Sequence, residues 1–161
     1  MKQLLVLGTV MGLLAMLVQV VPAVGQTPGF TATLSGTQEV PAVMTPAGGE
    51  AVFTLSPDGM TLSFTLTVSN INDVFASHIH LAAPGVVGPV VAPLFIGSKI
   101  GPFSGLLAQG TITAADLRGP LLGMPLSALV AEIETGNTYV NVHTTANPGG
   151  EIRGQINRLM P

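Results

Sequence analysis

The 161-residue chain contains no cysteine and no tryptophan, and only 8% of its residues are charged. Without cysteine there is no thiol nucleophile, no thiolate metal site, no disulfide and no lipid anchor on an N-terminal cysteine. The five basic residues are scattered, whereas a nucleic-acid face needs clustered cations to contact phosphates. The same scarcity excludes a basic helix that lies on a membrane surface.

Long apolar runs are also missing, except at the N-terminus, where residues 4–21 are mainly apolar. Lys2 precedes this run and Ala23-Val24-Gly25 follows it as a small-x-small cleavage site, which is the pattern of a signal peptide. We therefore expect a leader over residues 1–25 and one mature domain over 26–161, exported to the periplasm or secreted. The run just reaches the length of a membrane span, so an uncleaved N-terminal anchor is the alternative.

Apolar and polar residues alternate through much of the mature chain. The alternation is cleanest over residues 60–69, where every second residue is apolar and the others are Thr or Ser. A period of two is typical of a strand with one buried face. The turn sequence Ser56-Pro-Asp-Gly59 precedes it, which predicts a hairpin. Further strands are expected over residues 30–35, 50–56, 74–81, 105–112, 138–144 and 151–157, and an edge strand or extended loop over 86–96.

Helical patterns are few. Residues 125–135 have an apolar stripe, with Pro125 suited to the first turn and Gly136 placed to end the helix. Residues 113–117 are expected to form one helical turn with Thr113 as its N-cap. Seven or eight short antiparallel strands with one or two short helices predict an all-β, two-layer sandwich.

The chain has three histidines. His78 and His80 lie two residues apart on an expected strand, so they share the face opposite to Ile79. His143 ends another expected strand, on the face opposite to Val142. If Ile79 and Val142 are core residues, all three imidazoles lie on the outer surface, and they converge if the strands pair. Such a set suits copper first and zinc second, with the ligand nitrogens within about 4–5 Å of each other.

The three histidines also have a purely structural interpretation. Histidines on a strand are often polar outer-face residues that bond to loop carbonyls, and His143 is placed to cap the turn after it. Glu39 is expected to fix a loop, and Glu151 and Arg153 to form an exposed pair on one strand face. A carboxylate close to an imidazole would orient the ring of a metal ligand. The apolar loop 82–94 either packs over the end of the sheet or exposes a patch that suits a partner.

Three separated motifs occur along the chain: Leu34-Ser-Gly-Thr-Gln-Glu-Val-Pro41, Ser77-His-Ile-His-Leu81, and Tyr139-Val-Asn-Val-His-Thr144 followed by Asn147-Pro-Gly-Gly-Glu-Ile-Arg-Gly154. In this order they resemble the chordin-type (CHRD) domain, from about Phe30 to Ile156. The chain is similar to bacterial exported single-domain members of that family, whose role is unknown. Chordin itself antagonises bone morphogenetic proteins, and we do not extend that activity to this chain.

The resemblance implies an immunoglobulin-like sandwich with a limited likeness to copper/zinc superoxide dismutases. His78-Ile-His80 resembles two copper ligands on one dismutase strand, and Arg153 lies in a run similar to the segment with that enzyme's active-site arginine. The enzyme's paired zinc site and bridging histidine need more than the three histidines present. A full copper/zinc dismutase is therefore excluded, whereas a single three-histidine copper site is not.

Two hypotheses follow from the sequence. The first is an exported, non-enzymatic binding or interaction module for an unknown protein or surface partner. The second is a metalloprotein that binds copper, or secondarily zinc, through His78, His80 and His143, and serves copper handling or redox chemistry.

Overall fold

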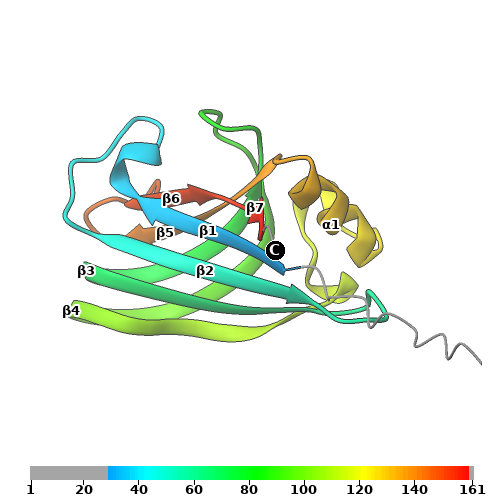
Figure 1. The fold of residues 1–161 in the computed structure, drawn as a ribbon. Helices are drawn as coiled ribbons and strands as arrows, with labels where there is room; N and C mark the ends of the chain where they lie inside the picture. The colour runs from blue at the N-terminus through cyan, green and yellow to red at the C-terminus, as the bar shows by residue number, and fades with distance from the viewer. Residues whose placement is uncertain (1–28, 160–161) are drawn as a thin grey trace, which may run out of the picture.

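A computed structural model describes residues 29–159 (Figure 1). The expected leader over residues 1–25 lies outside this range. Among the described residues, no helix is both long and apolar enough to cross a membrane. The strands are β1 (Gly29–Ser35), β2 (Gly48–Leu55), β3 (Leu62–Leu81), β4 (Val90–Ile112), β5 (Thr138–Thr144), β6 (Ile152–Gln155) and β7 (Asn157–Arg158). The helix is α1 (Leu126–Glu134), and three short 3-10 turns are η1 (Gly36–Gln38), η2 (Ala114–Asp116) and η3 (Gly119–Leu121).

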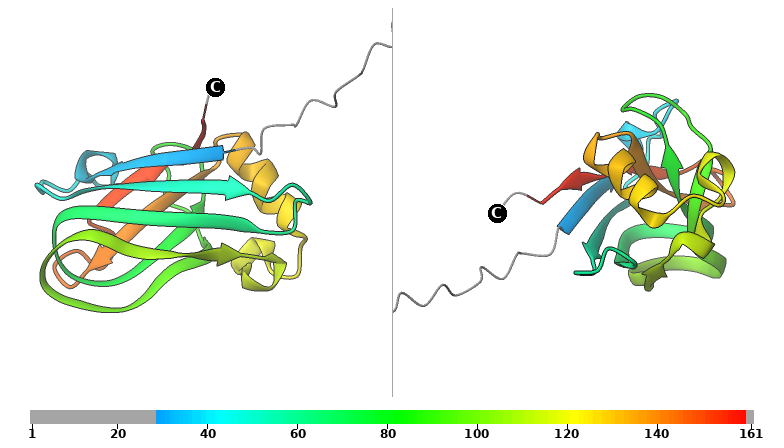
Figure 2. Two further views of the ribbon diagram at one scale, coloured as in Figure 1. Left: turned by 60° about the horizontal axis from the view of Figure 1, so that its bottom comes forward. Right: turned by 90° about the vertical axis from the view of Figure 1, so that its right-hand side faces the viewer.

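The strands form one antiparallel sheet that closes on itself. Their order is β2-β1-β6-β5-β3-β4, and β2 also pairs with β3. This extra pairing closes a five-stranded barrel, and β4 continues the sheet beyond it along β3 (Figures 1 and 2). The all-β, antiparallel prediction is confirmed, but the two-layer sandwich must be corrected to a closed barrel.

The closure depends on a bend in β3. The first half of this 20-residue strand pairs with β2, and the second half pairs with β5. Between the halves, Asn70 (φ 53°) and Asp73 (φ 51°) adopt the left-handed conformation, and the register against β4 shifts. Asn and Asp are the non-glycine residues that accept this conformation most readily. The alternation pattern predicts two separate strands for these halves, over residues 60–69 and 74–81. It also divides β4, which is continuous over 23 residues.

Apolar residues fill the barrel, and α1 covers one end of it (Figure 2, right). Ile79, Val140 and Val142 are fully buried, as the alternation requires. The predicted helix is confirmed within one residue at each end, and Gly136 (φ 73°) follows its last turn. The predicted turn at 113–117 is also present, with a capping box between Thr113 and Asp116. The barrel wall made by β3, β5 and β6 thus packs its inner face against the core and presents the alternate residues on its outer face.

Candidate metal centre

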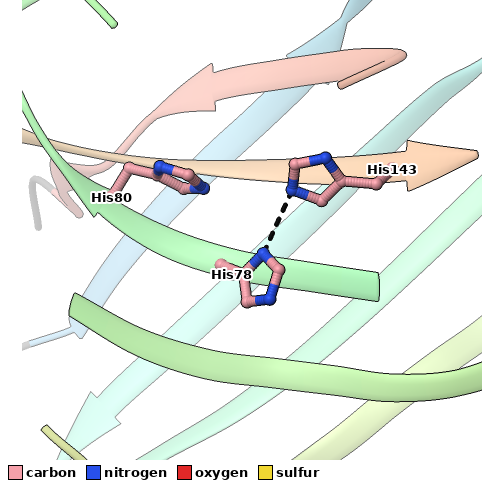
Figure 3. A group of neighbouring side chains, drawn as sticks. All are labelled: His78, His80 and His143. Carbon is pink, nitrogen blue, oxygen red and sulfur yellow. Dashed lines mark hydrogen bonds between the residues drawn. The ribbon is translucent and has the colours of Figure 1, made fainter. Parts of the chain in front are cut away.

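The pairing of β3 with β5 brings the three histidines together. The register sets His80 opposite Tyr139, His78 opposite Asn141, and Ala76 opposite His143. Directly opposed residues in an antiparallel pair share a face, so these side chains lie on the outside of the barrel wall. Figure 3 shows the three imidazoles on the same side of β3 and β5.

The outer face is covered rather than exposed. His80 and His143 are each only 8% accessible, and His78 is half-buried. The cover over His80 is the loop 82–89, and the turn 145–150 lies against His143. The predicted face is therefore correct, but these histidines lie below the molecular surface.

The ring nitrogens of the histidines are spaced closely enough for one metal ion. One nitrogen from each ring lies within 4.8 Å of the others. His78 Nδ1 is 3.0 Å from His143 Nε2 (Figure 3). Ligands at ~2.0–2.1 Å from a common ion are at most about 4 Å apart, so the rings need to close by less than about 1 Å.

Backbone carbonyls determine the tautomers of two rings. His80 Nδ1 lies 2.8 Å from the Gly88 carbonyl oxygen, and His143 Nδ1 lies 2.9 Å from that of Pro148. A carbonyl can only accept, so each Nδ1 carries the proton and each Nε2 keeps a lone pair. His78 Nδ1 then donates to His143 Nε2. His80 Nε2 is buried and has no hydrogen-bond partner among residues 29–159.

The electrostatics favour neutral imidazoles. Burial, together with the neighbouring His143 and His80, lowers the pKa of His78 to about 4. Burial also lowers the pKa of His80 and of His143, and the carbonyls of Gly88 and Pro148 partly oppose this. Near neutral pH the three rings are therefore in the form that binds metals.

Tyr139 and Arg153 extend the site across β5 to β6. The Tyr139 ring stacks on His80 with centroids 4.9 Å apart and planes inclined by 14°. Arg153 Cζ lies 3.4 Å from the Tyr139 centroid, and the guanidinium donates to the carbonyls of Val86 (2.9 Å) and Ala83 (3.3 Å). Arg153 thus fixes the loop 82–89 and reaches His80 through Tyr139.

Glu151 supports the other covering segment. Its carboxylate accepts hydrogen bonds from Thr144 Oγ1 (2.5 Å), Thr45 Oγ1 (2.7 Å) and Asn147 Nδ2 (3.2 Å). These bonds fix the turn whose Pro148 carbonyl binds His143. Glu151 and Arg153 are 8% and 2% exposed and have separate partners, so the expected exposed pair is wrong. The prediction that a carboxylate orients an imidazole is also wrong for these two rings. Backbone carbonyls, not carboxylates, accept from Nδ1 of His80 and of His143.

Glu39 lies behind the same turn. It is 9% exposed, and its Oε1 has no partner within the described range. A Cβ at Gly150 would be 2.4 Å from this oxygen, so glycine is needed there. Burial raises the pKa of Glu39 to about 7, although Arg153 acts in the opposite direction. A cavity of about 270 Å³ lies beside Glu39 and Arg153.

Three contributors to the site are not singled out by the sequence analysis. Tyr139 and Asn141 are placed on the correct face there, but neither is weighed as part of the site. Phe75 lies at a register shift between Val74 and Ala76, and its ring is 5.9 Å from that of His143. A bulge of this kind re-aims a side chain and leaves no clear trace in the alternation pattern.

Comparisons with known proteins show to which family the chain belongs. Neither the comparison with curated proteins nor that with solved structures finds a match. The family model of the CHRD domain matches residues 30–156, a range that contains the three histidines and all the residues that surround them. The chain therefore belongs to the CHRD domain family.

Proposed function

We propose that the protein binds a divalent transition-metal ion through His78, His80 and His143, copper(II) in preference to zinc(II). The observation that carries this proposal is the Nε2 atom of His80, a lone pair that is buried without a hydrogen-bond donor. Buried polar atoms in folded proteins almost always have a partner. A metal ion between the rings supplies that partner.

The covering segments support the proposal because they orient the ligands in advance. Gly88 and Pro148 hold the protons of His80 and His143 on Nδ1, so both rings keep a lone pair on Nε2. The lone pair of His80 has no partner among the described residues, and that of His143 accepts from His78 Nδ1, a hydrogen bond that the metal ion would replace. Metal-binding histidines usually donate their other N–H to a carbonyl or carboxylate in this way. Imidazole ligands bind copper(II) more tightly than zinc(II), which gives the order of preference.

The proposed role is copper handling after export. The half-buried His78 is the most accessible of the three ligands, and it marks the side from which an ion would enter. Redox chemistry would require a further coordination position that stays open to a substrate. We propose it only as a second step, to be tested by superoxide and peroxide assays once binding is established.

The interaction-module hypothesis draws its support from a different observation. Val86 and Val87, in the loop 82–89, are 53% and 65% exposed. Arg153 holds the same loop in place, so these side chains form a small fixed apolar surface. The two functions are compatible, because this loop also orients His80.

Isothermal titration of the mature protein with Cu(II) and with Zn(II) tests the metal proposal. We expect one ion per chain, with affinity reduced at least 100-fold in the His78→Ala/His80→Ala double variant, because one imidazole cannot chelate. Ser63→Ala, an exposed change elsewhere on β3, should titrate like the wild type. Equal isotherms for the wild type and the double variant would reject the proposal.

A further inference from the structure

Asn141 lies among the three histidines. It is directly opposite His78 in the β3–β5 register and two residues before His143 on its own strand. It therefore shares the outer face with all three rings, and it is 2% exposed. The carboxamide is enclosed in the same covered space as the imidazoles.

The orientation of this carboxamide follows from its surroundings. Asn141 Nδ2 lies 3.4 Å from the carbonyl oxygen of Gly149, which can only accept a hydrogen bond. The reversed orientation would set two acceptor oxygens against each other. The amide oxygen Oδ1 therefore points away from Gly149, and it has no hydrogen-bond partner in the part of the chain that the structure describes.

Two neighbouring buried atoms thus need a partner of the same kind. Asn141 Oδ1 and His80 Nε2 both present lone pairs, and neither has a hydrogen to offer the other. The Asn141 side chain is close enough to the His80 ring to act on it. A cation between the strands is attracted to both atoms, whereas an apolar filling would satisfy neither.

We infer that Asn141 is a fourth ligand of the metal ion, through Oδ1, so that the site has three nitrogens and one oxygen. This inference rests on the proposed function and makes it more specific. Zinc(II), which favours four ligands, would be closed to a substrate in such a site. Copper(II), which favours tetragonal arrangements, would not be limited to these four ligands.

The test compares two substitutions at Asn141 with a matched change elsewhere. Asn141→Asp keeps the shape and gives the ligand oxygen a charge, although it loses the hydrogen bond to Gly149 and so destabilises the apo protein. We expect Cu(II) and Zn(II) to bind it at least about tenfold more tightly. Asn141→Ala removes the oxygen and should weaken both by about tenfold or more. Asn72→Asp, an exposed site on β3, adds the same charge away from the site and should leave both affinities unchanged. Co(II) absorption should change in both Asn141 variants, because it reports the ligand set directly.

The results distinguish a failure of the Asn141 inference from a failure of the three-histidine proposal. If the double histidine variant loses the metal while both Asn141 variants bind it as the wild type does, Asn141 is not a ligand and the three-histidine site stands. If the wild type binds no better than the double histidine variant, both are overturned. Thermal unfolding of each apo variant identifies a folding defect, and Asn141→Asp, which preserves the side-chain shape, decides the matter if Asn141→Ala fails to fold.

Discussion

His80 Nδ1 and the Gly88 carbonyl oxygen are joined by a hydrogen bond of 2.8 Å across the loop that covers the histidine cluster. The Gly88 N–H in turn donates to the Tyr139 hydroxyl at 3.2 Å, and the Tyr139 ring stacks on His80. One glycine therefore connects the covering loop to both strands of the site.

Gly88→Ala should damage both the fold and the site. A Cβ at this position would be 2.0 Å from the Leu81 carbonyl oxygen, so the loop must move and the bond to His80 is lost. We expect a loss of about 2 kcal/mol in the free energy of unfolding, measured by urea denaturation. Metal affinity should fall by about tenfold, because the carbonyl no longer fixes the His80 tautomer.

The control for this change is Val87→Ala in the same loop. Val87 is 65% exposed, so its truncation should alter stability by less than about 0.5 kcal/mol. Equal stability of the two variants would show that the loop does not depend on the close packing of Gly88.

Arg153→Lys should loosen the loop 82–89 although the charge is kept. Lysine has neither the planar fork that reaches the carbonyls of Val86 and Ala83 together nor the flat surface that stacks on Tyr139. We expect a loss of about 2 kcal/mol in stability and faster amide hydrogen exchange in residues 82–89. Arg158→Lys, at an exposed side chain with one weak ion pair, is the matched control and should change neither. Unchanged exchange in the Arg153→Lys variant would contradict this role.

Glu39→Gln should stabilise the protein at high pH and much less at low pH. The folded-state pKa of Glu39 is raised to about 7 from 4.5. Folding therefore favours the protonated carboxyl, and its contribution to stability is complete below about pH 4.5 and lost as the pH rises through 7. Glutamine keeps the neutral shape at every pH. We expect the free energy of unfolding of the variant to be about 1–2 kcal/mol larger than that of the wild type at pH 8. This figure is smaller than the pKa shift alone implies, because water reaches part of the side chain and screens its charge.

Urea unfolding at pH 4.5 and pH 8 measures this difference. Glu50→Gln, the same change at an exposed position on β2, is the matched control. A Glu39→Gln advantage that does not grow with pH would mean that the carboxyl is charged without penalty in the folded protein.

The alternation in the sequence was sufficient to assign the outer face of the wall. Side chains alternate strictly along a strand, so the apolar Ile79 and Val142 require that His78, His80 and His143 face the other way. The helix was equally predictable, because Pro125 and Gly136 mark its ends by local backbone preferences. These inferences need only a few consecutive residues.

The closure of the barrel and the partners of Glu151 and Arg153 could not be predicted from the sequence. Barrel closure depends on pairings between strands far apart in the chain, β1 with β6 and β3 with β5. It also depends on the bend at Asn70 and Asp73, which lets the two halves of β3 pair with different strands. The partners of Glu151 and Arg153 likewise come from loops whose paths no periodicity describes. Loop positions depend on long-range packing and hydrogen bonds, and these exist only in the folded molecule.

The residues that share a face and the two ends of the helix can be predicted from short segments, because both follow from local backbone geometry. The closure of the sheet, the covering of the histidine face and the contacts of the Gly88 and Pro148 carbonyls with the rings arise only in the folded molecule. Those outcomes depend on contacts between segments far apart in the chain, where many arrangements satisfy the same local pattern.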